Sequence, residues 1–249
     1  MFGLFKKKPL PLENYSVLGT DMHSHLLPGI DDGAPDLETS LGLIGQLQAL
    51  GFRQIYTTPH IREGLYPNTP ELVLKKRDEV QTALQQAGLT VNFDVAAEYF
   101  LDESFDAALR GSALLCLPGR RVLIEMSPRQ PYPDLHRVLF DLQMSGYHPV
   151  LAHPERYTYY KRTEDYEQLK TLGCSLQVNM LSLTGYYGKP VQAAAQMIIQ
   201  GKLADFLATD LHHERHVEKL QQALKHPVMM AVLSENTFLN TELERSECV

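Results

Sequence analysis

The sequence predicts an α/β protein, with a distorted (β/α)7 TIM-like barrel in a single domain as the first choice. Two observations lead to this prediction. Seven apolar, often β-branched runs alternate strictly with helix-like segments, which is the pattern of a parallel sheet with outer helices. The 249 residues also contain no long linker, low-complexity block or repeat, and α/β barrels of roughly 250 residues often form one domain. Seven units are one fewer than in the standard barrel of eight, so an open doubly wound sheet is the second choice.

The predicted strands are the apolar runs at 16–23, 52–60, 91–99, 120–126, 148–153, 175–180 and 204–210. The predicted helices lie at 36–51, 69–88, 102–110, 133–146, 163–172, 189–201 and 213–225. In the first helix, leucine and isoleucine recur at helical spacing and Gly51 ends the pattern. The second helix begins with Thr69 as a cap before proline and ends at Gly88.

Composition and charge argue against several classes of function. The net charge of −7 argues against a general nucleic-acid binder, which usually carries a basic excess. Cys116, Cys174 and Cys248 are far apart, which predicts free thiols, a cytoplasmic protein and no cysteine nucleophile. No apolar run reaches the roughly 18 residues of a membrane span. Residues 1–16 are predicted to be a flexible N-terminal extension and 17–249 the barrel domain.

Polar side chains gather at the ends of the predicted strands, where parallel barrels build their sites. Six of the seven strands end in His, Asp or Glu; these residues are His23 and His25, His60, Glu98, Glu125, His153, and Asp210 with His212. Clustered carboxylates repel one another unless cations lie among them. Imidazole and carboxylate groups are ligands for zinc, iron or manganese. The sequence therefore predicts a metal cluster at this end of the barrel.

The stretch DDG follows the first strand and is expected to close over the cluster. Gly33 allows the loop to turn. Adjacent side chains point apart, so only one of Asp31 and Asp32 is expected to ligate a metal ion. The other is a candidate cap for the following helix.

Seven motifs occur in an order that resembles the PHP (polymerase and histidinol phosphatase) superfamily: DMHSH, DDG, TTPH, AEYF, LIEM, AHPERY and ATDLH. Within it, the chain is most similar to the bacterial PHP-type tyrosine-protein phosphatases of capsule and exopolysaccharide operons. The resemblance runs from about 19 to 240. It implies a distorted (β/α)7 barrel with two or three divalent metal ions, of which manganese is expected and iron or zinc are alternatives. The implied ligands are His23, His25, Asp32, His60, Glu98, Glu125, His153, Asp210 and His212.

The resemblance also implies residues that contact a phosphate. Arg156, in the motif HPERY, resembles an arginine that these phosphatases place near the phosphate. Similar proteins often carry a second arginine in a longer segment after the final DxH. Here DLHHERHVEKL is compact, and Arg215 is the candidate for that role. Arg62 and His213 are further candidates for binding the substrate, and Asp31, His213, His216 or a bound water for protonating the leaving group.

The function that follows is hydrolysis of protein phosphotyrosine, with a bacterial tyrosine kinase as partner and any membrane contact made only through that kinase. Tyrosines in the loops after the strands are candidates to stack on the substrate ring or to cover the barrel rim; they are Tyr66, Tyr132, Tyr157, Tyr159, Tyr160, Tyr186 and Tyr187. Two alternatives stay open: a small-molecule phosphatase, for example for histidinol phosphate, and a non-catalytic PHP module that binds a partner. An amidohydrolase is not supported, because glutamates stand where a modified lysine would be expected.

Overall fold

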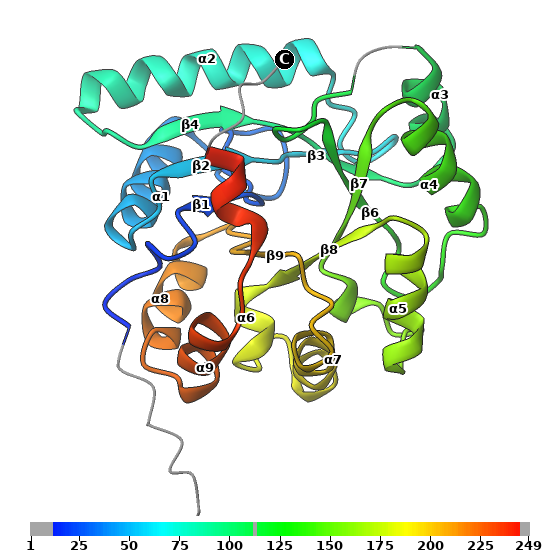
Figure 1. The fold of residues 1–249 in the computed structure, drawn as a ribbon. Helices are drawn as coiled ribbons and strands as arrows, with labels where there is room; N and C mark the ends of the chain where they lie inside the picture. The colour runs from blue at the N-terminus through cyan, green and yellow to red at the C-terminus, as the bar shows by residue number, and fades with distance from the viewer. Residues whose placement is uncertain (1–11, 112–113, 245–249) are drawn as a thin grey trace, which may run out of the picture.

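Two parallel sheets form the centre of the protein, and helices surround them (Figure 1). This computed structural model describes residues 12–111 and 114–244. The three-stranded sheet has the order β1 (Thr20–Asp21), β2 (Gln54–Thr57), β4 (Asn92–Val95). The six-stranded sheet has the order β3 (His60–Ile61), β5 (Glu98–Phe100), β6 (Arg121–Glu125), β7 (His148–Ala152), β8 (Ser175–Asn179), β9 (Phe206–Ala208).

The helices follow the strands along the chain, as the sequence predicts. They are α1 (Leu37–Ala49), α2 (Pro70–Ala87), α3 (Glu103–Gly111), α4 (Leu135–Met144), α5 (Thr163–Thr171), α6 (Met180–Leu183), α7 (Lys189–Gln200), α8 (Glu214–Ala223) and α9 (Pro227–Glu235). Two 3-10 helices, η1 (Pro154–Arg156) and η2 (Leu239–Glu244), complete the described chain. α6 and α9 are not among the helices predicted from the sequence. α9 begins with a proline in its first turn, and the side chain of His226 caps it by accepting a hydrogen bond from the amide of Val228.

The predicted caps of α2 are present, whereas α1 is capped by Asp36 and not, as expected, by an aspartate of the DDG stretch. The Asp36 side chain accepts a hydrogen bond from the amide of Thr39 and starts α1. The Thr69 side chain accepts one from the amide of Leu72 and starts α2. Gly88 ends α2 with a φ of 70°, in the left-handed region that favours glycine. Each N-cap of this kind stabilises its helix by about 1 kcal/mol.

Two of the predicted strands are each divided in two, which corrects the expectation of seven unbroken strands in one sheet. The second becomes β2 and β3, with Pro59 between them, and the third becomes β4 and β5. Proline has no N–H to donate, so the strand ladder breaks there. Backbone hydrogen bonds nevertheless continue across the break, since the amide of Ala96 donates to Thr57 O and that of Glu98 to Pro59 O.

The segments that follow β1 and β9 are joined by backbone hydrogen bonds. The amide of Asp210 donates to His23 O over 2.8 Å, and the amide of His25 donates to Leu211 O over 2.8 Å. The first and last strands of the chain therefore lie side by side near their carboxyl ends, which places His23 and His25 next to Asp210.

Nearer the amino ends of β1 and β9, a side chain from η2 connects the two strands. Asn240 is fully buried, and its Oδ1 accepts from the amide of Leu207. Its Nδ2 donates to Leu207 O and to Thr20 O, over 2.7 and 2.9 Å. One amide thus links β9 to β1.

We expect Asn240→Ala to lower the free energy of unfolding by about 3 kcal/mol. The substitution removes three hydrogen bonds to backbone groups of Leu207 and Thr20, and each such bond contributes about 1 kcal/mol. Urea unfolding followed by circular dichroism measures the change. Asn92→Ala, on the exposed face of β4, is the matched control. Equal stability of the two variants would contradict the structural role of Asn240.

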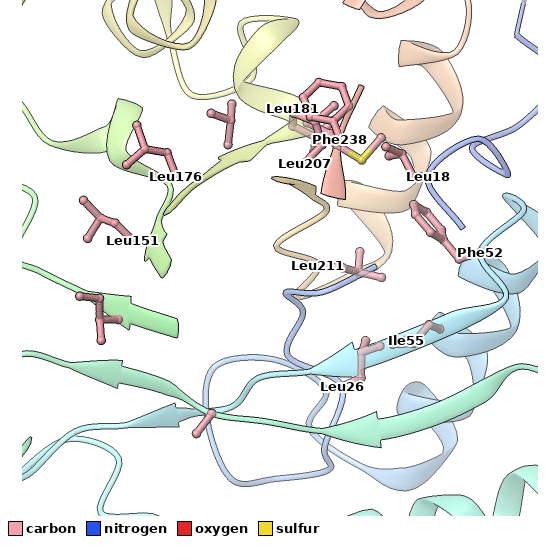
Figure 2. Close-up of a cluster of buried hydrophobic side chains, with 14 of the residues drawn as sticks. Leu18, Leu26, Phe52, Ile55, Leu151, Leu176, Leu181, Leu207, Leu211 and Phe238 are labelled. Carbon is pink, nitrogen blue, oxygen red and sulfur yellow. The ribbon is translucent and has the colours of Figure 1, made fainter. Parts of the chain in front are cut away.

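Apolar side chains fill the space on both faces of the strands. The larger cluster lies between strands and helices, and Figure 2 shows Ile55, Leu151, Leu176 and Leu207 from four strands among its members. A smaller cluster on the opposite faces contains Met22, Tyr56, Leu123, Val150, Phe206 and Leu243. Because successive residues of a strand point to opposite sides, Val150 and Leu151 belong to different clusters. Leu243 of η2 belongs to the smaller cluster, and Leu239 of η2 packs against it.

The predicted N-terminal extension, 1–16, lies largely outside the described residues, which begin at Leu12. Tyr15, within its described part, is fully buried, packs on Phe52 with the ring centroids 5.8 Å apart, and donates a hydrogen bond to Leu220 O. Among the described helices, none has the length and apolar character needed to cross a membrane.

Candidate metal centre and active site

The nine side chains that the family resemblance implies as metal ligands lie close together at the carboxyl ends of the strands. Their donor atoms form four overlapping groups, and within each group the atoms lie within 4.8 Å of one another. The groups are His25, Asp32, His60 and His212; His23, Glu98 and His153; His23, His25 and Asp210; and His60, Glu98 and Glu125. Shared members in these groups are what a site for more than one ion requires.

Glu98 lies at the centre of this cluster and is fully buried. Its Oε1 is 3.1 Å from His153 Nε2. Its Oε2 accepts no hydrogen bond from any residue that the structure describes, although His60 Nδ1 lies 3.0 Å away and His23 Nε2 3.4 Å away. A buried carboxylate oxygen without a hydrogen bond is unfavourable by roughly 1–3 kcal/mol or more. Oxygen and nitrogen donors that converge in this way, with one oxygen that accepts no hydrogen bond from the described residues, fit a bound cation.

The electrostatics of the cluster lead to the same conclusion. Burial raises the pKa of Glu125 to about 8, and the neighbouring charge of Glu98 adds to the shift. Burial lowers the pKa of His23, but the charges of Glu98 and Asp210 outweigh it and raise that pKa to about 9. Without a metal ion, protons on the imidazoles must balance the negative charge of the buried carboxylates. Metal binding would release such protons, because a histidine ligand must be neutral.

Neighbouring side chains fix the orientation of the histidine rings. His25 Nδ1 donates to Asp31 Oδ2 over 2.8 Å, and His23 Nδ1 donates to Gln177 Oε1 over 2.9 Å. The Nε2 atom of each ring then faces the cluster. A carboxylate or carbonyl oxygen behind a histidine is the usual support of a metal ligand, because it fixes the tautomer and raises the basicity of the ring.

Residues of β8 supply further support that the sequence analysis missed. Gln177 Nε2 donates to Asn179 Oδ1 over 2.9 Å, and Asn179 Nδ2 donates to Asp210 Oδ2 over 2.6 Å. Neither Gln177 nor Asn179 is among the site residues predicted from the sequence. Two amides at alternate positions of a buried strand were the available signal, because they point to the same interior side as the ligands.

The structure assigns different positions to the two aspartates of the DDG stretch. The Asp31 carboxylate is fully buried, and it also accepts hydrogen bonds from the amides of Gly33 and His60. Burial would raise the pKa of Asp31, but His25 and these hydrogen bonds lower it below the ordinary value. Asp31 is not among the described residues that line the cavity. The structure therefore does not support the expectation that Asp31 protonates the leaving group, and its contact with His25 indicates a positioning role instead.

Asp32 faces the cluster instead. Its Oδ1 lies 3.4 Å from His60 Nε2 and 3.4 Å from His212 Nε2, and the side chain is half exposed. The loop between β1 and α1 is tightly packed, because a Cβ atom added to Gly33 would lie 2.0 Å from His25 O. Glycine is required here by this close approach of the backbone.

We expect Asp31→Asn to weaken metal binding by about 10- to 100-fold, because His25 loses its charged hydrogen-bond acceptor. Titration of the metal-free protein with Mn²⁺, followed by calorimetry, measures the affinity. Activity should recover at saturating metal, since Asp31 does not face the cavity. The control is Asp36→Asn, which keeps the cap of α1 because asparagine caps helices equally well. An unchanged affinity in Asp31→Asn would contradict the positioning role.

Two ligand candidates have a backbone conformation that residues other than glycine rarely adopt. His153 has a φ of 33° and Asp210 a φ of 50°. Such residues are strained by about 1–3 kcal/mol and cluster at functional sites. Hydrogen bonds hold them in place: the amide of Asp210 donates to His23 O, and the amide of His153 donates to Gln177 Oε1.

A cavity of about 410 Å³ opens above the cluster. Of the nine ligand candidates, all except His23 and His25 line it. The remaining lining residues are Arg62, Leu65, Tyr66, Arg156, Tyr187, His213 and His216. Acidic and imidazole groups thus form one part of the wall, while cationic, aromatic and apolar groups form the rest.

The three arginines predicted to contact the substrate differ in their position relative to the cavity. Arg156 lines the cavity, its Nη1 donates to Asp210 Oδ2 over 3.2 Å, and its guanidinium lies 5.2 Å from the ring centroid of Tyr187. Arg62 also lines the cavity, with its guanidinium 3.9 Å above the ring of Phe100. Arg215 is exposed, lies 5.9 Å from the ring centroid of Tyr186, and is not among the described residues of the cavity wall. The expected role of Arg215 at the phosphate is not supported.

Histidines and tyrosines near the cavity also differ in position. His213 is exposed and lines the cavity, whereas His216 is buried there and accepts a hydrogen bond from the amide of His212. Of the seven tyrosines predicted as candidates, the described cavity wall contains Tyr66 and Tyr187. Tyr157 is buried and donates to Ala152 O, so it supports the end of β7.

Comparison with known proteins identifies relatives over most of the chain. The family described as "Capsular polysaccharide synthesis, CpsB/CapC" matches residues 19–230. The chain is 30% identical to the tyrosine-protein phosphatase YwqE of Bacillus subtilis (strain 168) over 195 residues, which cover 78% of this chain and 77% of the relative. It is 26% identical to the tyrosine-protein phosphatase CpsB of Streptococcus pneumoniae over 200 residues, which cover 78% of this chain and 82% of that protein.

A solved structure is similar over a larger part. It comes from work on YwqE of Bacillus subtilis and CpsB of Streptococcus pneumoniae, described as unique metal-dependent tyrosine phosphatases. The TM-score is 0.78 at 27% identity, and the match covers 92% of this chain and 96% of the other.

Proposed function

The chain belongs to the CpsB/CapC family of capsular polysaccharide synthesis, and on this premise we propose that it is a metal-dependent phosphatase that hydrolyses phosphotyrosine in proteins. The observation that carries this proposal is the buried Oε2 of Glu98, which accepts no hydrogen bond from the described residues although imidazole nitrogens surround it, at the base of a cavity that Arg156 also lines. The relatives named as tyrosine-protein phosphatases support the choice of substrate.

The nine ligand candidates would hold two or three divalent ions, with Mn²⁺ as the expected metal. Mixed imidazole and carboxylate donors without thiolate suit manganese, iron or zinc, and the four overlapping donor groups support more than one ion. When bound, such ions supply Lewis acidity, which lowers the pKa of water and neutralises the charge of a phosphate ester. Asp31 and Gln177 would position His25 and His23 for this task.

Arg156 would bind the phosphate group directly. Its planar guanidinium presents paired donors that match phosphate oxygens. The hydrogen bond to Asp210 and the ring of Tyr187 hold it at the cavity wall. Arg62 and His213 lie at the same wall and would contact the substrate farther from the phosphorus atom.

The finer description of the fold is also a proposal, namely a distorted seven-stranded barrel. Its seven strands would be β1, β2 with β3, β4 with β5, β6, β7, β8 and β9. The pairing of neighbours in this order supports it, and so do the hydrogen bonds that join the segments after β9 and β1. A barrel would explain why residues from every part of the chain face one site.

The physiological substrate would be a phosphorylated bacterial tyrosine kinase that regulates capsule or exopolysaccharide synthesis. The family name supports the link to capsule synthesis. Phosphotyrosine suits this site because its leaving group is a phenolate, whose pKa near 10 demands less help from an acid than an alkoxide does.

A side-by-side assay tests the proposal. The protein supplied with Mn²⁺ is expected to hydrolyse a phosphotyrosyl peptide faster than a phosphoseryl peptide or histidinol phosphate. Elemental analysis should find two or three ions in each chain, and chelation should abolish activity until metal is returned. Equal or faster hydrolysis of histidinol phosphate would contradict the proposed substrate, and metal-independent hydrolysis would contradict the proposed chemistry.

A further inference from the structure

A short turn between β3 and α2 carries one leucine to the mouth of the active-site cavity. Leu65 is 55% exposed and lines the cavity next to Tyr66. The described part of the chain has four other large apolar side chains with comparable exposure, and these do not line this cavity: Val17, Leu72, Phe140 and Met144. A single exposed leucine is ordinary on a protein surface, so exposure alone does not indicate a function for Leu65.

The turn is closed by its own backbone. The amide of Arg62 donates to Tyr66 O, and the amide of Tyr66 donates to Arg62 O, both over 2.9 Å. Gly64 has a φ of 77°, which permits this tight reversal. The Arg62 guanidinium lies over the ring of Phe100 and attaches the turn to β5. Leu65 therefore has a defined position.

The turn is also fixed relative to the metal centre. Asn68 is buried, and its Nδ2 donates to His60 O over 2.8 Å and to Ile30 O over 3.0 Å. The ring of Tyr66 stacks on that of His60, with centroids 5.2 Å apart and planes inclined by 9°. These contacts connect the wall that carries Leu65 to a ligand candidate and to the loop of Asp32.

We propose that Leu65 is a specificity-determining residue, which together with Tyr66 forms an apolar wall for the phenyl ring of phosphotyrosine. This inference rests on the proposed function. A phosphate held by the metal cluster and Arg156 places the next part of the substrate at the mouth of the cavity. In phosphotyrosine that part is the ring, whose apolar surface the wall would remove from water. In phosphoserine it is a methylene group and polar backbone, to which the same wall offers little.

Replacement of Leu65 by alanine tests this inference in the Mn²⁺-loaded protein. We expect kcat/KM for a phosphotyrosyl peptide to fall about tenfold, the size of effect that lost methylene groups produce in an apolar pocket. The loss should appear in KM, with kcat nearly unchanged, because the ring contact is the same in the ground state and the transition state. Leu72→Ala removes the same atoms from an exposed position on α2 and should behave as the wild type. Leu65→Met, which conserves volume, should restore most of the affinity.

A binding measurement separates this inference from the proposed function. Calorimetry with a phosphonomethyl-phenylalanine peptide, which is not hydrolysed, should show about tenfold weaker binding to Leu65→Ala. Inorganic phosphate, which has no ring, should inhibit both proteins equally. Equal losses for the peptide analogue and inorganic phosphate, or a Leu65→Ala variant that matches Leu72→Ala, would overturn the inference and leave the proposed function intact. A wild-type protein that hydrolyses only histidinol phosphate would instead overturn the proposed function, and the inference with it.

Discussion

Glu98→Gln is expected to lower kcat for hydrolysis of an aryl phosphate by roughly 10³-fold, the range found when a preorganised charge-stabilising group is removed. The amide has nearly the volume of the carboxylate, so the packing of the fully buried side chain is kept. What changes is the charge of the oxygen that lies 3.0 Å from His60 Nδ1 and 3.4 Å from His23 Nε2. Because Glu98 belongs to two donor groups, the substitution should also reduce the number of bound ions.

Steady-state kinetics with 4-nitrophenyl phosphate and elemental analysis of the same preparations measure both effects. Glu79→Gln makes the same chemical change on the exposed side of α2, where the carboxylate pairs only with Lys76 among the described residues. This control should keep full activity and metal content, since an exposed ion pair contributes little. A Glu98→Gln protein with normal metal content and normal kcat would show that the cluster is not the catalytic centre.

Arg156→Ala is expected to lower kcat/KM about 10²- to 10³-fold, because a charge-assisted contact to the phosphate is lost where negative charge develops. Arg156→Lys should recover only part of this loss, since an ammonium group keeps the charge but not the paired donors. Metal content should stay normal in both variants, because Asp210 keeps its hydrogen bond from Asn179.

Arg215→Ala is the control that the structure supplies for this experiment. Arg215 is exposed and lies against Tyr186, outside the described cavity wall, so its removal should change kcat/KM by less than about threefold, as for surface substitutions. If Arg215→Ala were as damaging as Arg156→Ala, the segment after His212 would have to rearrange on substrate binding.

Much of the fold follows from local rules that act within a few residues. Thr69 and Gly88 mark the ends of α2 because capping depends on neighbouring backbone groups. The ligands were predictable from the family resemblance and from strand ends, because the carboxyl ends of parallel strands meet on one side. The break of the second strand was not predicted, although Pro59 was visible, because pairing across the break depends on partners far away in the chain.

The remaining features of the site depend on contacts that no local pattern encodes. Spacing alone could not decide between Asp31 and Asp32, because the decision lies in which carboxylate meets His25 Nδ1. The role of Gln177 is visible only in the folded chain, where its side chain on β8 accepts a hydrogen bond from His23, which follows β1. Leu65 was overlooked for the same reason, since only the folded turn brings it to the cavity.

The junction of the first and last strands has a consequence for synthesis of the protein. Thr209 and Asp21 are 188 positions apart in the sequence, and Asn240 and Thr20 are 220 apart. Contacts between such distant positions form late and slow the folding of a domain. On the ribosome, His23 and His25 emerge early and must wait for Asp210 and Asn240 before their pocket exists. A nascent chain therefore cannot bring the complete set of candidate ligands together until the segment that carries Asp210 and Asn240 has been synthesised.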